Sequence, residues 1–187
     1  MASAVIVSAA RTAIGTSRKG SLANTPAEKL AATVVKAAVE RSFAVFGLGA
    51  VDEVGRVAVA LADPEHADVR DTAVLALRHW IGVGPGRDQR LWQLLVERDG
   101  YRPAQADAVL HLLHSPFAPE LPETYETLIA YLQHAKLAVR ELAWWHLTRL
   151  AGRGEVRYDP AGPPEERARA CAALKKLVAD GKLPPKK

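Results

Sequence analysis

The sequence predicts an all-α protein: an α-α superhelix of stacked antiparallel helix pairs, with a short strand-like or disordered segment at its N-terminus. From about Gly47 onward, apolar residues recur at helical spacing between short breaks of glycine and proline. Within this region one helical pattern occurs twice, which indicates a repeat architecture. A single helix pair cannot bury its apolar face alone, so neighbouring pairs are expected to close a continuous core.

The repeated pattern is Val-Arg-acid-x-Ala, followed by further apolar residues and then by glycine. Its two copies occupy residues 69–82 and 139–152. In both copies apolar residues stand at positions i, i+4, i+8 and i+11, which lie on one face of a helix. Gly82 and Gly152 stand where each helix is expected to end, so we expect both to be left-handed caps.

This pattern resembles HEAT repeats, whose second helix commonly begins with Val-Arg and continues with Ala and Leu. The resemblance covers residues 48–82 and 124–152. It implies an armadillo-type stack in which Arg70 and Arg140 have a structural role between repeats. We expect the two guanidinium groups to lie in water or to bond a neighbouring turn. Contact with a ligand or partner is the alternative for both arginines.

The chain divides into three parts on this interpretation. Residues 1–24 form a loosely ordered extended segment, residues 25–181 the helical repeat domain, and residues 182–187 a disordered basic tail. Proline at a first helical turn and glycine after the last turn mark further helices. Their expected ranges are 88–98, 103–114 and 164–180.

The first forty residues differ from the rest. Residues 5–7 are a β-branched run typical of a strand, and Thr25-Pro26 begins a helix whose apolar face includes Ala38 and is widened by Val39. Three stretches, at residues 5–15, 20–22 and 26–32, resemble the amino terminus of thiolases, the acetyl-CoA acetyltransferase family. The resemblance extends from about Ala4 to Arg41.

Thiolases use a nucleophilic Cys, a His in a Gly-rich His-Pro motif and a second Cys as acid and base. Cys171 is the only cysteine, lies among Ala, Arg and Lys, and no His is followed by Pro-x-Gly. The sequence therefore predicts no enzyme and no catalytic residue. A catalytically incomplete fragment or fusion of a thiolase-type acyltransferase, or a misjoined reading frame, is the alternative.

The composition and the remaining motifs narrow the possible location, metal ligands and cofactors of the protein. One cysteine cannot form an internal disulfide, so a reducing, cytoplasmic location fits. No apolar run is long enough to span a membrane. His111 and His114 share a helix face but lack further ligands, so no metal is expected. The glycines of residues 82–87 follow no strand and lack the Lys-Ser/Thr ending of a phosphate-binding loop, so no cofactor is expected either.

Two adjacent tryptophans, Trp144 and Trp145, are the leading candidates for partner binding, together with Arg70 and Arg140. Adjacent helical side chains point about 100° apart, so both rings cannot face the same core. Aromatic anchors are enriched at binding hot spots, whereas packing of both rings between helices is the favoured alternative.

The leading functional prediction is a non-enzymatic interaction module that binds a protein partner. A nucleic-acid-binding repeat is a second alternative, because aromatic and basic residues mix near residue 100. Acidic Glu97 and Asp99 dilute that basic character. The aromatic and basic residues concerned are Trp92, Arg98, Tyr101 and Arg102. The sequence determines neither the partner nor the oligomeric state.

Overall fold

The computed structural model describes residues 27–152 and 156–184, and within these ranges all regular structure is helical. The strand predicted at residues 5–7 and the whole expected N-terminal segment, residues 1–24, lie outside the described residues. The elements are α1 (Ala27–Ala50), α2 (Val54–Ala60), α3 (Ala67–Gly82), α4 (Arg87–Gln93), the π-helical turn η1 (Leu94–Arg98), α5 (Pro103–His114), α6 (Pro122–Tyr131), α7 (Leu137–Leu150) and α8 (Pro164–Ala179).

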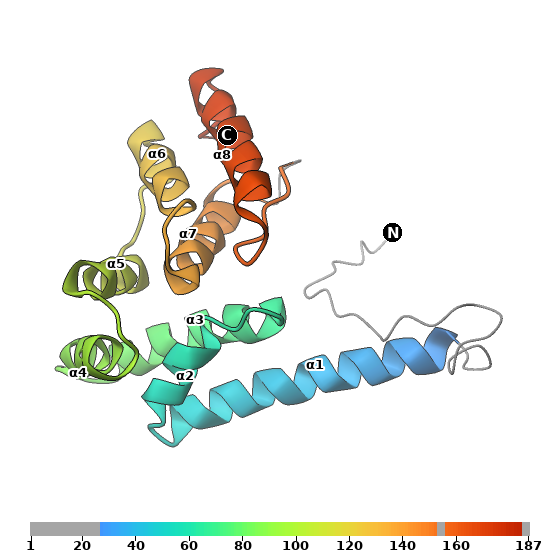
Figure 1. Cartoon of the computed structure of the whole chain (residues 1–187), viewed down its shortest axis with the longest axis vertical. Helices are drawn as coiled ribbons and strands as arrows, with labels where there is room; N and C mark the ends of the chain where they lie inside the picture. Colours follow the sequence, from blue (N-terminus) through green and yellow to red (C-terminus); the bar gives the residue numbers. More distant parts are fainter. Residues whose placement is uncertain (1–26, 153–155, 185–187) are drawn as a thin grey trace.

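The helices stack in layers, with α3 between α1 and α7 (Figure 1). The short helix α2 packs on α1 and α3, while α6 packs on α7 and α8. Helix α5 contacts both α3 and α7 and joins the two ends of the stack. One apolar core runs from Val45 on α1 to Leu174 on α8. The all-α superhelix predicted from the sequence is therefore confirmed. None of the helices in the described ranges combines the length and apolarity that crossing a bilayer requires.

The two copies of the repeated pattern have the same local structure. Each Val-Arg pair begins a helix, α3 or α7, and its Val is buried. The Arg70 N–H donates to the His66 carbonyl at 3.2 Å, and the Arg140 N–H donates to the Lys136 carbonyl at 3.3 Å. Each guanidinium then turns back to the preceding turn, so the two copies share this local arrangement.

The two glycines at the ends of these copies differ in conformation. Gly152 has φ 73°, as expected of a left-handed cap. Gly82 remains helical, and the helix is capped by Val83 at φ −74°. The prediction of a left-handed cap at Gly82 is therefore wrong. Residues 83–86 continue in a glycine-rich turn whose left-handed residue is Gly86, at φ 77°.

These two glycines predict opposite effects of alanine on stability. Gly82→Ala should raise the free energy of unfolding by about 0.5–1 kcal/mol, because no atom lies within 4 Å of the new Cβ and alanine favours helix. Gly152→Ala should lower it by about 1–2 kcal/mol, because alanine resists positive φ. Urea unfolding of both variants tests this, and effects of equal sign would contradict it.

The remaining helices begin and end close to their expected residues. Helices α5 and α8 both start at the predicted prolines, and α8 is closed by Gly181 at φ 65°. The expected helix at 88–98 is divided into α4 and the π-helical turn η1. The basic tail predicted to be disordered from residue 182 is packed in its first part: Leu183 is buried, and its N–H bonds to the Leu177 carbonyl at 3.1 Å.

Candidate functional site

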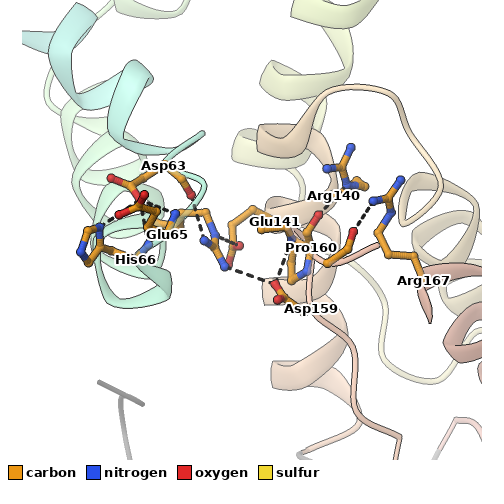
Figure 2. Close-up of polar contacts among 11 residues, drawn as sticks. Asp63, Glu65, His66, Arg140, Glu141, Asp159, Pro160 and Arg167 are labelled. Carbon is orange, nitrogen blue, oxygen red and sulfur yellow. Dashed lines mark hydrogen bonds and ion pairs between the residues drawn. The ribbon is translucent and has the colours of Figure 1, made fainter. Parts of the chain in front are cut away.

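A buried ion pair joins the two copies of the repeat. The Nε of Arg70 on α3 donates to Glu141 Oε2 on α7 at 2.5 Å, and both side chains are 4% exposed. The guanidinium also donates to the Asp63 carbonyl at 2.9 Å and lies 3.7 Å from Asp159. Figure 2 shows this network between the turn that carries Asp63 and the loop that carries Asp159. The guanidinium of Arg70 is thus engaged by groups of the same chain, which indicates a structural role for this network.

The carboxyl group of Glu141 is the most perturbed acid in this network. Burial raises its pKa to about 7, and this outweighs the lowering effect of the adjacent Arg70. Between about pH 4.5 and 7 the folded chain therefore binds more protons at this site than the unfolded chain. The contribution of Glu141 to stability falls as the pH rises through this window.

Arg140 has the equivalent role on α7. Its Nη1 donates to the carbonyls of His134 and Ala135 at 2.8 and 2.9 Å, which closes the turn before the helix. Its Nε donates to the Pro160 carbonyl at 2.7 Å, so it also holds the loop that leads to α8. Burial lowers the pKa of Arg140 from its ordinary value. Figure 2 shows Arg140 turned toward Pro160.

These contacts decide between the two interpretations of Arg70 and Arg140. Both residues are buried, with 3% and 7% of their surfaces exposed. Both guanidinium groups bond a neighbouring turn, as one of the two expectations stated. Each also contacts a further segment, α7 for Arg70 and the loop before α8 for Arg140, and neither lies in water. The two buried arginines are therefore poor candidates for binding a partner at the surface.

Trp144 is half-buried and packs inside the chain. Its ring lies 5.2 Å from that of Tyr158, whose hydroxyl donates to the Leu132 carbonyl at 2.5 Å. Burial raises the pKa of Tyr158 well above its usual value. Trp144 therefore packs within the chain, which was the alternative expected for both tryptophans. Its contact with Tyr158 holds the loop after α7 against the helix.

Trp145 points to a different side of α7 and lies between two cations. The guanidinium carbon of Arg149 is 4.0 Å from the ring centroid, and that of Arg78 on α3 is 5.3 Å away. Arg149 is exposed, while Arg78 and Trp145 are half-buried. An arginine above an aromatic face is held by the ring quadrupole and keeps its hydrogen-bond donors free for other groups. We call these three residues, with His111 and Phe117, the tryptophan surface.

The base of the tryptophan surface is built on the C-terminal end of α5. The last carbonyls of a helix have no partner within it. Arg78 donates to the Leu113 carbonyl at 2.6 Å, and His146 Nε2 donates to the Leu112 carbonyl at 2.7 Å. Phe117 covers the His146 ring at 4.7 Å. Side chains from α3 and α7 are thus fixed in position by the end of α5.

The tryptophan surface concentrates positive charge. Burial, and then the nearby charge of Arg149, lower the pKa of Arg78. Burial also lowers the pKa of His146, with further lowering from Arg78, Arg149 and His111. Within the part of the chain that the structure describes, no carboxylate forms an ion pair with Arg78 or Arg149. The arrangement can bind an anionic group beside an aromatic face.

The other candidates from the sequence have intramolecular roles. His111 and His114 are both exposed, His114 lies 4.0 Å from Asp88, and no cluster suited to a metal occurs among the described residues. Cys171 is buried on α8, and burial raises the pKa of its thiol, the opposite of what a nucleophile needs. The turn at residues 82–87 leads into α4, a helix of only 7 residues.

The mixed aromatic and basic residues near residue 100 are also engaged within the chain. Trp92 donates to Asp107 at 2.8 Å, and Arg98 donates to the Gly55 carbonyl at 2.6 Å and to Asp99 at 2.9 Å. Tyr101 is buried beneath the Lys136 ammonium, 4.0 Å from its ring centroid. Arg102 is exposed, whereas the other three residues are engaged within the chain, so the described residues near position 100 form no basic groove.

Comparison with known proteins adds one family match to this all-helical architecture. Residues 4–77 match the thiolase, N-terminal domain, family model. This extends the resemblance seen in the sequence from about Arg41 into α3, and the described part of the match is helical. No curated protein and no solved structure matches the chain. The matched segment contains neither Cys171 nor the tryptophan surface.

Sequence reasoning identified Trp145 but missed its two arginines. Arg149 stands four residues after Trp145 and therefore on the same helical face, a signal that was available. Arg78 stands on another helix and becomes a neighbour only when α3 packs on α7.

Proposed function

We propose that this chain is a HEAT-like, non-enzymatic interaction module that binds an acidic segment of a protein partner at the tryptophan surface. The observation that carries the proposal is the position of Arg78 and Arg149 against the ring of Trp145, with no carboxylate of the described chain in an ion pair with either arginine. An aspartate or glutamate side chain would supply the missing charge, and an aromatic anchor in a fixed pocket is typical of binding hot spots.

A protein segment fits this surface better than a nucleic acid does. Nucleic-acid backbones are recognised by extended basic grooves or by rows of stacking aromatics. On the tryptophan surface two arginines lie against a single tryptophan ring, and the second aromatic-basic stretch near residue 100 is engaged internally. A short acidic segment needs only a few such contacts.

The test is a titration of the full chain with a fluorescein-labelled glutamate-rich peptide, followed by fluorescence anisotropy. Arg149→Glu should weaken binding at least roughly 10-fold, because it replaces an attractive contact with a repulsive one. Binding by the wild-type chain should also weaken as salt is raised. The matched control is Arg56→Glu, which makes the same charge change at an exposed residue of α2.

Three outcomes would overturn the proposal. One is an absence of binding by the wild-type chain, and another is an equal loss in both variants, which would report only net charge. The third is tighter, Arg149-dependent binding of a DNA duplex of equal charge, which would favour the nucleic-acid alternative. Circular dichroism checks that Arg149→Glu remains folded, because this residue also lies in the last turn of α7.

A catalytically incomplete thiolase-type fragment is the second candidate, and the family match over residues 4–77 favours it. Thiolysis of acetoacetyl-CoA by the purified full chain tests whether any thiolase activity is present. An interaction module and an incomplete fragment both predict no turnover, because Cys171 is buried and its raised pKa disfavours the thiolate. Turnover that is lost in Cys171→Ser would establish an enzyme instead.

A further inference from the structure

The outer side of α1 carries an apolar stripe that no element of the described chain covers. It consists of Val35, Val39, Phe43 and Phe46, whose exposed fractions are 61%, 47%, 74% and 47%. Intervals of four, four and three residues place these side chains on one face of the helix. Val39, expected from the sequence to widen the face toward the core, therefore lies on the outside.

The inner side of α1 is separate from this stripe. It packs on α3 through the buried residues Ala38 and Val45, and through Gly49, where an added Cβ would lie 3.6 Å from Ala76. α1 thus has one apolar face against the stack and a second one facing outward at the edge of the molecule (Figure 1). In stacked helical arrays the outer face of a terminal helix is normally polar. An apolar outer face indicates a further layer.

The side chains of the stripe indicate what kind of surface would cover it. Residues 42–51 contain no charged side chain, over about three helical turns. The charged residues beside the first part of the stripe, Lys36 and Glu40, pair with each other at 3.8 Å, so the stripe offers no net charge with which to select an acidic or basic partner. Exposed contiguous apolar surface of this kind marks an interface. Val39, Phe43, Phe46 and Ala50 follow intervals of four, three and four residues, which are the a and d positions of a helix-pairing seam.

We propose that the stripe is a homodimer interface, in which α1 of a second copy packs antiparallel across it. A two-fold interface must be self-complementary, so large groups must meet small ones on the same surface. Gly47 supplies the small site beside the two phenylalanines, because no atom lies within 4 Å of a Cβ added there. With the two-fold axis midway between Phe43 and Gly47, the Phe43 ring of each copy lies over Gly47 of the other.

The length of the stripe sets the area that a dimer would bury. From Val35 to Ala50 it is about 24 Å long at 1.5 Å per residue. Two such helices facing each other bury on the order of 1,000 Å² in total, at the lower end for a specific interface. Interfaces of this size are typical of weak, reversible association. This interface uses α1 alone and is independent of the tryptophan surface.

The test is sedimentation equilibrium of the full chain over a range of concentrations. The wild-type chain should show a reversible monomer–dimer equilibrium. Phe43→Glu should weaken it by roughly 100-fold or more, since the two-fold axis doubles the effect of each buried charge. Leu121→Glu is the matched control: Leu121 is a 49% exposed apolar residue that precedes α6, away from α1, and should leave the equilibrium unchanged.

A second variant separates the interface from folding. Gly47→Gln fills the site for the partner's phenyl ring, so it should weaken the dimer about 10-fold or more. The same change should raise the thermal unfolding midpoint of the monomer, because glutamine favours helix over glycine. Destabilisation of the fold cannot produce this combination.

Several results would overturn the proposal. They are a wild-type chain that stays monomeric at every soluble concentration, a dimer that tolerates Phe43→Glu, and a dimer that Leu121→Glu disrupts equally. A monomer would mean that something other than a second copy covers the stripe. Persistence of the dimer in Arg149→Glu shows that the two surfaces act separately, and its loss there would place the interface on the tryptophan surface.

Discussion

Replacing Arg70 with methionine should lower the free energy of unfolding by about 3–5 kcal/mol near pH 8. Methionine keeps much of the side-chain volume but leaves Glu141 buried without its cation, and an uncompensated buried charge is costly. The Asp63 carbonyl also loses a donor. The measurement is urea unfolding, followed by circular dichroism.

The loss should shrink toward acid pH. Glu141 takes up a proton in the fold at a higher pH than in the unfolded chain, because burial raises its pKa to about 7. Without Arg70 that pKa rises further, since the guanidinium opposes the effect of burial. In Arg70→Met, stability should therefore keep falling with rising pH beyond the range in which the wild type levels off. A pH-independent difference between the two proteins would contradict this account.

Two controls isolate the buried charge. Arg90→Met removes an ion pair with Asp52 that has the same 2.5 Å separation but is about half exposed. The loss there should be far smaller, because solvent screens an exposed ion pair. The double variant Arg70→Met with Glu141→Leu should recover most of the stability, because an apolar pair can replace a buried ion pair. If the double variant were as unstable as the single one, the charge would not be the cause.

Replacing Arg140 with methionine should lower the free energy of unfolding by about 2–4 kcal/mol. The change removes donors from three carbonyls, those of His134, Ala135 and Pro160, and hydrogen bonds from a charged group contribute more than neutral ones. The estimate stays below that for Arg70 because no buried acid is left behind.

The site of the damage distinguishes this variant from a general loss of stability. Arg140 holds the loop at Pro160, so amide hydrogen exchange should accelerate most in residues 156–163. Arg140→Lys should recover less than half of the loss, because one ammonium group cannot reach both segments as the guanidinium fork does. Uniform acceleration across all helices, or full recovery with lysine, would contradict the assignment.

The helices could be predicted from the sequence because their signals are local. Proline at the first turn determined the starts of α5 and α8, and the periodic apolar residues of α3 and α7 are buried as expected. Gly82 and Gly152 look alike in the sequence, yet Gly82 stays within α3, whereas Gly152 has a positive φ of 73°. A glycine permits a left-handed conformation without requiring it.

The contacts that define the sites depend on packing between distant segments. The acids at residues 71 and 141 occupy equivalent positions in the two copies, and the sequence does not say that Arg70 pairs with the second one. The cation pair around Trp145 likewise requires α3 to lie beside α7. On α1, helical spacing found apolar residues but did not separate the face toward α3 from the stripe that faces outward.

The buried pair between Arg70 and Glu141 also has a consequence for the order in which the chain can fold during synthesis. Arg70 is added to the growing chain 71 residues before its carboxylate partner Glu141. Until α7 is made, α3 cannot bury that guanidinium against this acid, so Arg70 stays hydrated. The segment that matches the thiolase family ends at residue 77, inside α3, and so cannot complete its own core. The face of α3 that carries Arg70 is therefore buried only after α7 has been made and has packed on it.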